Sequence, residues 1–516
     1  MRIVSRSSED GLSDRQQRQP DILLVVADQL TPMALPFYGP WPTHAPEMAD
    51  LAANGVVFDA AYCNVPLCAP SRVVMMTGRL PSRVGVYDNA TEFPAGVPTF
   101  AHALRLGGYR TVLAGKMHFC GPDQLHGFEE RLTTDIYPAD FGWTPDWDRP
   151  DERLEWYHNM SSVLEAGTCL RTNQLDFDDE VAFAAERKLY ELARDRSDDR
   201  PFLMAVSFTH PHDPFAIPQP YWDLHDDDAV PMPERAPDAR DPHALRLRRM
   251  YEIDVTPPSP AQVRAARRAY MGSISYVDAQ LGRLRRALAA AGRGRETVVM
   301  LLSDHGEMLG ERGLWYKMNF YEPSVRIPLV VHAPGRFRPG RAAEAVSLAD
   351  LGPTLLDLAG LPPMPGLIEG RSLLPHLKGE GGHDEVVAEY LAEGALAPIV
   401  MLRRGPWKFA HSPADPDQLF DLDRDPGELV NLAPDPEHAD TVDAFRREVA
   451  ARWDLEALDR AVRESQRQRR FVFAAGRAGA RRTAWDFQPF ADASEQYIRS
   501  HKPLDALEAA ARFPRP

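Results

Sequence analysis

Cysteine and long apolar runs are scarce in this chain. Only four of its 516 residues are cysteine, too few for a disulfide framework at this length. No apolar run reaches the roughly eighteen residues of a membrane-spanning helix, so we expect no membrane segment. Residues 1–20 are polar and lack the apolar core of a secretory signal. We therefore predict a flexible extension at residues 1–20 and a cytoplasmic protein.

Positive charge is also in short supply. The chain has 59 Lys and Arg residues against 75 Asp and Glu, a formal net charge of -16. A net negative field disfavours nucleic acids and anionic membranes as partners. It is compatible with a substrate that carries a cationic group. The length predicts one large globular domain with a smaller one beside it.

Three continuous apolar runs each end in polar residues. They cover residues 22–27, 202–208 and 297–303. Such runs are typical of strands buried on both faces of a parallel α/β sheet, and open sheets of this kind bind ligands at the carboxyl ends of their strands. The polar residues that follow the three runs are Asp28, His210, His212, Asp304 and His305.

The pattern changes along the chain. Apolar residues spaced three and four apart predict a helix over 266–291. After about residue 382, short strand-like runs at 386–391, 398–402 and 407–410 precede a helical pattern at 441–453. We interpret this part as a small α+β subdomain. The aromatic segment at 485–490 needs a surface to cover, on its own chain or on a neighbouring subunit.

Cys68 opens the most informative motif, C-x-P-S-R-x4-T-G-R, at residues 68–79. Most cysteines are small buried hydrophobes or redox groups. This motif instead resembles the sequence that sulfatase-maturing enzymes oxidise to formylglycine, whose hydrate can attack sulfur. A buried cysteine before an ordinary turn is the alternative, and the number of fixed positions in the motif disfavours it.

A metal site is predicted from the strand ends. Asp28, Asp304 and His305 can ligate one divalent metal, with the oxygen of a modified Cys68 completing the set. These ligands are hard, which favours Ca²⁺, with Mg²⁺ or Mn²⁺ as alternatives. The two aspartates could instead cap the elements that follow them. Their combination with His305 and the Cys68 motif favours the metal.

Four side chains are candidates for stabilising an anionic group. Arg72 lies one helical turn after Cys68. Lys116 and His118 would share one face of an extended strand. Apolar residues flank Lys116 and Lys317, which predicts buried ammonium groups that need an anion.

Three histidines are candidates for protonating a leaving group. They are His118, His210 and His212, and a neutral histidine can equally be a satisfied core residue. The sequence leaves the choice between His210 and His212 open.

Five segments, in order along the chain, resemble the sulfatase branch of the alkaline phosphatase superfamily. They are residues 68–72, 115–118, 211–214, 303–306 and Lys317. The resemblance implies an α/β fold with a mostly parallel central sheet flanked by helices, a smaller C-terminal α+β subdomain and an extended C-terminal tail. Many sulfatases have paired acidic residues after the first strand. Here the pair is Asp28-Gln29, so Gln29 is left out of the ligand set.

Within that branch, longer segments resemble the choline sulfatases. They are residues 28–32, 87–90, 121–128, 134–147 and 485–490. The resemblance implies choline-O-sulfate as substrate and choline and sulfate as products. It also implies a formylglycine-generating enzyme as partner and a homo-tetramer or dimer formed through the tail. It adds Asn89 to the catalytic set formed by Cys68, Arg72, Lys116, His118, His212 and Lys317.

A quaternary ammonium group is bound by aromatic faces and carboxylates, because it offers no N–H donor. Tryptophan and tyrosine residues cluster with acidic residues between positions 143 and 157. Ordinary core aromatics are the alternative interpretation. The substrate-binding candidates are Trp143, Trp147, His158 and Glu393.

Three other functions are alternatives. A phosphonate monoester or phosphodiester hydrolase would use the same nucleophile, since sulfate and phosphate are nearly isosteric. A two-zinc phosphatase is disfavoured because Lys116 and Lys317 would occupy the place of a second metal. A non-catalytic scaffold is disfavoured by the intact set of site residues. The predicted organisation is an extension (1–20), a catalytic sulfatase domain (21–380), an α+β subdomain (381–462) and an oligomerisation tail (463–516).

Overall fold

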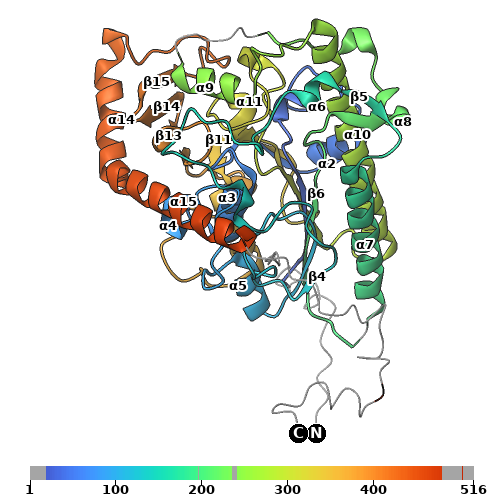
Figure 1. Ribbon diagram of the computed structural model, residues 1–516. Coiled ribbons are helices and arrows are strands. Elements are labelled where there is room, and N and C mark those ends of the chain that lie inside the picture. Colours follow the sequence, from blue (N-terminus) through green and yellow to red (C-terminus); the bar gives the residue numbers. More distant parts are fainter. Residues whose placement is uncertain (1–18, 196, 235–240, 479–502, 504–516) are drawn as a thin grey trace, which may run out of the picture.

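The computed structural model describes residues 19–195, 197–234, 241–478 and 503 (Figure 1). Almost all of the predicted N-terminal extension, and the tail segment 485–490, lie outside the described residues. Within the described ranges, no helix is both long and apolar enough to cross a membrane.

A nine-stranded sheet forms the centre of the large domain. Its order is β11-β2-β10-β8-β1-β6-β3-β4, with β9 paired to β2. β10 runs antiparallel to both neighbours and β9 is antiparallel to β2, whereas the other pairs are parallel. The predicted mostly parallel sheet is confirmed. The strands are β1 (Asp21–Ala27), β2 (Val56–Tyr62), β3 (Arg110–Gly115), β4 (Glu130–Arg131), β6 (Phe202–Phe208), β8 (Thr297–Leu302), β9 (Arg326–Ile327), β10 (Leu329–His332) and β11 (Gly340–Ser347).

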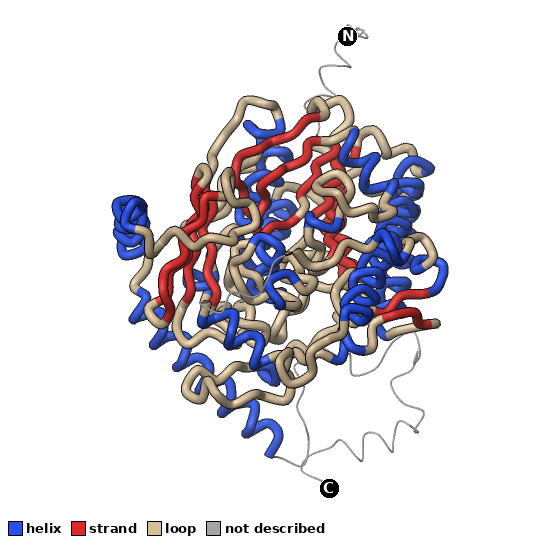
Figure 2. The backbone as a smooth tube through the Cα atoms, turned by 90° about the horizontal axis from the view of Figure 1, so that it is seen from above, coloured by secondary structure: helices blue, strands red, loops and turns tan. Residues whose placement is uncertain are grey.

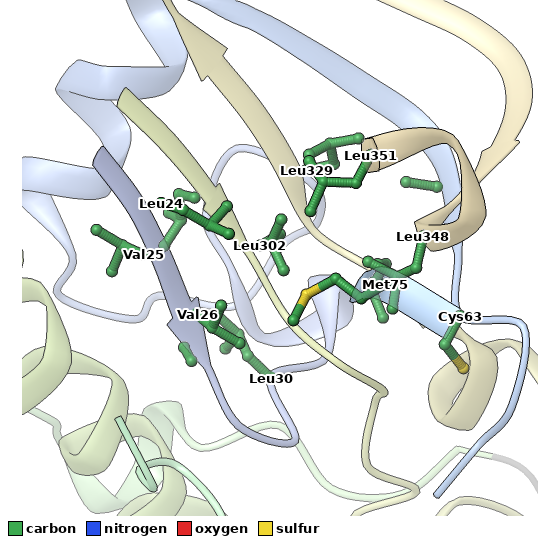
Figure 3. Packing of buried hydrophobic residues seen from close by; sticks show 14 of the residues in the cluster. Leu24, Val25, Val26, Leu30, Cys63, Met75, Leu302, Leu329, Leu348 and Leu351 are labelled. Carbon is green, nitrogen blue, oxygen red and sulfur yellow. The ribbon is translucent and has the colours of Figure 1, made fainter. Parts of the chain in front are cut away.

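Helices cover both faces of this sheet (Figures 1 and 2). On one face α7 (Asn173–Arg194) packs against α10 (Pro260–Ala290), and on the other α12 (Leu351–Ala359) contacts α3 (Cys68–Thr77) and α5 (Phe100–Leu106). The central strands are therefore apolar on both sides. Figure 3 shows Val26 and Leu302 of the central strands near Met75 of α3.

The predicted helix at 266–291 begins earlier in the structure, at Pro260. Ser259 caps this helix. Its side chain accepts a hydrogen bond from the backbone N–H of Gln262, and the side chain of Gln262 accepts one from the backbone N–H of Ser259. Proline at the first helical position is compatible with this start because its missing N–H would have no partner there.

The smaller sheet is antiparallel, in the order β12-β13-β14-β15. Its strands are β12 (Glu385–Tyr390), β13 (Ile399–Arg404), β14 (Trp407–Ser412) and β15 (Asp415–Asp421). α14 (Ala439–Arg452) packs against β14. The buried ammonium of Lys408 on β14 pairs with Glu428 and, at 2.9 Å, with Glu322 of α11 (Glu322–Val325) in the large domain.

α15 (Leu455–Ala478) follows the small subdomain, and the predicted boundary at 462/463 falls inside it. It contacts η2 (Phe141–Trp143) and lies across the molecule near α3 (Figure 1). The remaining elements are η1 (Pro32–Ala34), α2 (Pro46–Ala53), α4 (Pro81–Val84), α6 (Ser161–Leu164), β5 (Gly167–Cys169), β7 (Ala216–Pro218), α8 (Gln219–Trp222), η3 (Asp227–Ala229), α9 (Pro242–Met250), η4 (Glu311–Gly313), η5 (Leu348–Asp350), α13 (Leu374–Leu377) and η6 (Pro436–His438).

Candidate active site

Four potential ligands meet at the carboxyl end of the central strands. Asp28 follows β1, and Asp304 and His305 follow the neighbouring β8. Cys68 is the first residue of α3. The ligand atoms of these four buried side chains all lie within 4.8 Å of one another. The parallel pairing of β1 with β8 brings residues 276 positions apart in the sequence to one point, because Val26 pairs with Leu302.

The donor set fits a divalent metal. Oδ1 of the buried Asp28 has no hydrogen-bond partner among the described residues, which leaves a carboxylate oxygen for a cation. Burial alone would raise the pKa of Asp28, but the positive charges of Lys116 and Arg72 help to lower it to about 2. The carboxylate is therefore ionised. Two carboxylates, an imidazole and an oxygen at residue 68 are suitable ligands for Ca²⁺ or Mg²⁺.

Cys68 stands at the N-terminus of α3, with its Sγ atom 3.1 Å from Nε2 of His305. In a formylglycine enzyme, Sγ marks the place of the reactive oxygens. Burial would raise the pKa of the thiol, but Lys116, Lys317 and His305 hold it well below its ordinary value. The same cations would stabilise an anionic oxygen at this position. Asn89 Oδ1 accepts from the backbone N–H of Ala69 at 2.9 Å and so holds the first turn of α3.

Arg72 and Lys116 provide fixed positive charge beside Cys68. Nε of Arg72 donates to Asp304 Oδ2, and its Nη1 donates to Ser207 Oγ, both at 2.8 Å. The Lys116 ammonium pairs with Asp28 and lies 4.1 Å from the centre of the Tyr137 ring. Both cations are fully buried.

The prediction that Lys116 and His118 share a strand face is wrong. β3 ends at Gly115, which has a φ of 98°, and His118 has a φ of 53°. Positive φ breaks the extended chain, and one carboxylate oxygen of Asp135 accepts from the His118 backbone N–H at 2.9 Å. Neither ring nitrogen of His118 has a partner within the described part of the chain. Burial lowers the pKa of His118, and Cys68 acts in the opposite direction.

Lys317 is held by a chain of hydrogen bonds. Its ammonium lies 2.8 Å from Nε2 of His212 and donates to Oε1 of Gln29. Nε2 of Gln29 donates in turn to the buried Glu307. The amide of Gln29 is bonded at both ends, so the structure gives it the role of a bridge to Lys317.

The two histidines after β6 occupy different surroundings. His210 Nδ1 lies 2.7 Å from Asp178 Oδ2 of α7, and its ring meets Tyr276 edge-on. His212 contacts Lys317 and lies 3.4 Å from the Tyr137 hydroxyl. The structure therefore places His212 beside Lys317, whereas it pairs His210 with Asp178 of α7.

An aromatic cluster adjoins the nucleophile. The ring centre of Trp143 lies 5.7 Å from that of His118, 5.4 Å from that of Tyr137 and 6.3 Å from that of Trp156. Trp156 contacts Tyr157 edge-on at 4.6 Å. Sequence reasoning did not single out Tyr137, although it lies in the segment 134–147 that resembles the choline sulfatases.

Glu393 is a buried carboxyl group. It is 2% exposed, and its Oε2 has no hydrogen-bond partner among the residues described. Burial raises its pKa to about 8, with a further contribution from Asp88. Burial raises the phenol pKa values of Tyr157, Tyr251 and Tyr390, and Glu393 raises them further. A buried carboxyl group near aromatic rings suits a cation with no hydrogen to donate, which would stabilise its ionised form.

The other two substrate-binding candidates differ in position. His158 stacks on Tyr316 at 4.5 Å, lies 6.2 Å from His212, and has a pKa lowered to about 3 by burial. Trp147 lies apart from the ring contacts made by Trp143. Its indole N–H donates to the Ala392 carbonyl at 2.8 Å, and Arg463 lies over its ring.

Three family models match successive, partly overlapping stretches of this chain. Residues 20–361 match the family described as "Sulfatase". Residues 310–453 match "N-sulphoglucosamine sulphohydrolase, C-terminal", and residues 460–513 match "Choline sulfatase enzyme C terminal".

Curated relatives and solved structures resemble the whole chain. It is 48% identical over 508 residues to the choline-sulfatase of Rhizobium meliloti (strain 1021), covering 96% of this chain and 99% of that protein. It is 27% identical to the arylsulfatase of Clostridium perfringens (strain 13 / Type A), covering 83% and 93%. The phosphonate monoester hydrolase of Agrobacterium radiobacter superposes with a TM-score of 0.68 at 25% identity, covering 85% and 96%. That of Silicibacter pomeroyi has a TM-score of 0.68 at 23% identity, covering 84% and 95%, and shares the fold.

Proposed function

The chain belongs to the sulfatase family, whose members hydrolyse sulfuric esters, and we propose that it converts choline-O-sulfate to choline and sulfate. The observation that carries the choice of substrate is the unpaired, buried carboxyl of Glu393 near the aromatic cluster. Burial raises the pKa of this carboxyl to about 8, so a sulfate ester of a neutral alcohol would leave it buried as the neutral acid. A trimethylammonium group would stabilise its ionised form.

The anionic end of the substrate would face the nucleophile. Arg72, Lys116 and Lys317 are all buried around Cys68. Fixed cations in a water-excluded site stabilise the charge that develops on the sulfuryl oxygens without reorganising. This arrangement supports the proposed sulfuryl transfer.

The cationic end would face the aromatic cluster. Trp143 and Trp156 have nearly parallel rings, 16° apart, and Trp156 contacts Tyr157. Glu393 is near enough to Tyr157 to add to the rise that burial causes in its phenol pKa. Aromatic faces attract a quaternary ammonium through their quadrupoles. We assign Trp143, His158 and Glu393 to this end. Trp147 stays a prediction with a less direct role, through its bond to Ala392.

The residues of the chain divide the proposed reaction between them. Asp28, Asp304, His305 and residue 68 would hold a metal, Ca²⁺ in our proposal, which would supply Lewis acidity at the sulfuryl group. Formylglycine at Cys68, made by a formylglycine-generating enzyme, would supply the nucleophilic oxygen. Nζ of Lys317 lies 2.8 Å from Nε2 of His212, and this pair would deliver a proton to the departing choline oxygen. Burial alone would lower the pKa of His118 and raise that of the Cys68 thiol, but the side-chain contact between the two residues opposes both effects. His118 would therefore accept a proton from residue 68.

We further propose a homo-tetramer or dimer formed through the tail, the part of the chain that holds the C-terminal family match at 460–513. Its measurement is sedimentation of the full chain against a chain that ends at residue 478, the last residue of α15.

The substrate is tested by comparing rates on choline-O-sulfate, 4-nitrophenyl sulfate, a phosphodiester and a phosphonate monoester. The protein should be co-produced with a formylglycine-generating enzyme, and the modified fraction of Cys68 measured by peptide mass. We expect kcat/KM to be highest for choline-O-sulfate, and choline to compete with it. A higher kcat/KM on the phosphonate monoester would reject the proposal in favour of the activity named for the Agrobacterium radiobacter structure.

A further inference from the structure

Arg469 of α15 makes a buried ion pair with Asp88 of the large domain. We infer that Arg469 is a positioning residue that fixes both the nucleophile helix and the aromatic cluster, which makes α15 part of the active-site scaffold. The inference rests on the proposed function, which identifies the parts of the site that bind the sulfate and the choline ends of the substrate. The ion pair itself lies outside the metal ligands, and it acts through the turns that carry Asn89 and Trp143.

The ion pair is bidentate and sealed from water. Nη1 and Nη2 of Arg469 lie 2.7 Å from Oδ1 and Oδ2 of Asp88. Their side chains are 6% and 0% exposed. A fork-shaped contact of this kind fixes the carboxylate plane as well as its position. Because both charges are buried, the loss of either one leaves the other uncompensated.

Asp88 transmits this position to the nucleophile. Its Oδ1 accepts from the Ala90 backbone N–H and from the Thr91 hydroxyl, both at 3.0 Å. These bonds fix the turn on either side of Asn89. Asn89 in turn accepts from the Ala69 N–H in the first turn of α3. The path from Arg469 to the residue next to Cys68 therefore runs through Asp88 and Asn89.

Arg469 also reaches the aromatic cluster. Its Nη1 donates to the Thr144 hydroxyl at 3.2 Å, and that hydroxyl donates to the Phe141 carbonyl at 2.8 Å. Phe141 and Trp143 are the two ends of η2. The guanidinium of Arg469 thus holds both the turn that carries Trp143 and the turn that carries Asn89. It thereby sets the distance between the parts of the site that bind the cationic and the anionic ends of the substrate.

A neighbouring arginine on the same helix provides a matched control. Arg467 also contacts the loop after Trp143, through two bonds to Asp148 at 2.6 and 2.9 Å. It is 58% exposed and Asp148 is 37% exposed. Solvent screens such a pair, so its removal should have little effect. Arg467→Met therefore controls for loss of an α15 arginine with no link to Asp88.

The test compares Arg469→Met and Arg467→Met in the full chain. Backbone hydrogen exchange is measured over residues 86–91 and 141–145. We expect exchange in both segments to rise at least tenfold in Arg469→Met and to stay unchanged in Arg467→Met. We also expect kcat/KM on choline-O-sulfate to fall about 100-fold, since misplacement of reacting groups by about 1 Å has this effect, with the loss on 4-nitrophenyl sulfate confined to kcat.

Two further variants keep the test decisive if Arg469→Met folds poorly. Arg469→Lys keeps the charge but not the fork, and Asp88→Asn/Arg469→Gln removes both buried charges. If the inference holds, both fold with the wild-type circular dichroism spectrum, and both raise exchange in the two segments. Unchanged exchange there in a folded variant overturns the inference. If wild-type protein cleaves 4-nitrophenyl sulfate but not choline-O-sulfate, the proposed substrate fails, while the exchange data still decide the role of Arg469.

Discussion

The binding of choline-O-sulfate should depend on pH through Glu393. Burial raises the pKa of this carboxyl from its ordinary 4.5 to about 8. Below pH 8 the free enzyme therefore holds mostly the neutral acid, whereas the substrate cation requires the carboxylate. The apparent KM equals the intrinsic value divided by the ionised fraction. It should thus exceed its high-pH limit roughly twofold at pH 8, about tenfold at pH 7 and about 100-fold at pH 6.

Glu393→Gln should abolish that dependence and weaken binding at pH 9. Charges about 4–8 Å apart at an effective dielectric near 20 interact by roughly 2–4 kcal/mol, so KM should rise about 30- to 1,000-fold. The same substitution that weakens binding should stabilise the fold. Because the folded-state pKa of Glu393 is raised, the free energy of unfolding of the wild-type protein falls as pH rises from about 4.5 to about 8. Glu393→Gln should therefore raise the free energy of unfolding at pH 9 by at most roughly 5 kcal/mol.

The assay is a KM series for wild type and Glu393→Gln between pH 6 and 9, with urea unfolding at both limits. 4-Nitrophenyl sulfate is the control, because it carries no cation and its KM should not follow the Glu393 titration. A wild-type KM for choline-O-sulfate that stays flat over this range would refute the reasoning. So would a Gln variant that kept the wild-type slope.

Three substitutions test the remaining parts of the site. Cys68→Ala should abolish turnover yet keep the thermal unfolding temperature within a few degrees, because covalent catalysis is lost while the cavity is small; retained activity would exclude formylglycine chemistry. Asp304→Asn should remove most activity by deleting a charged ligand, with partial recovery in excess Ca²⁺, and the single-metal proposal fails if chelator-treated wild-type enzyme stays fully active. Trp143→Ala should raise KM for choline-O-sulfate up to roughly thirtyfold, because it removes about 0.5–2 kcal/mol of cation–π attraction. KM for 4-nitrophenyl sulfate should change much less, and equal losses on the two substrates would reject the role of Trp143 in binding the cation.

Local patterns in the sequence were enough to predict the sheet and the strand-end cluster. The apolar run before Asp28 and the one before Asp304 each form a buried central strand, because residues covered by helices on both faces must be apolar along their whole length. The two aspartates meet because parallel neighbours end at the same edge. The motif at residues 68–79 was enough to add Cys68 to this cluster without any tertiary information.

Other parts of the site depend on contacts that no local pattern encodes. His210 contacts Asp178 and His212 contacts Lys317 because of how helices and loops pack. The sequence alone therefore could not predict which of the two histidines lies beside Lys317. The strand expected at Lys116 failed because positive φ at Gly115 turns the chain. Arg469 is one of many arginines in α15, and its burial against Asp88 is visible only when residues 381 positions apart are in place.

The buried Lys408 has a consequence for how this protein can be shortened. Its ammonium sits between Glu322 and Glu428 and is 2% exposed. Glu322 begins α11, five residues after Lys317, and its side chain is 15% exposed. A gene product ending before β14 would lack both Lys408 and Glu428 and would leave Glu322 without this cation. Because the loss of one member of a largely buried ion pair is destabilising, we expect a protein trimmed to its larger sheet to be less stable near Lys317.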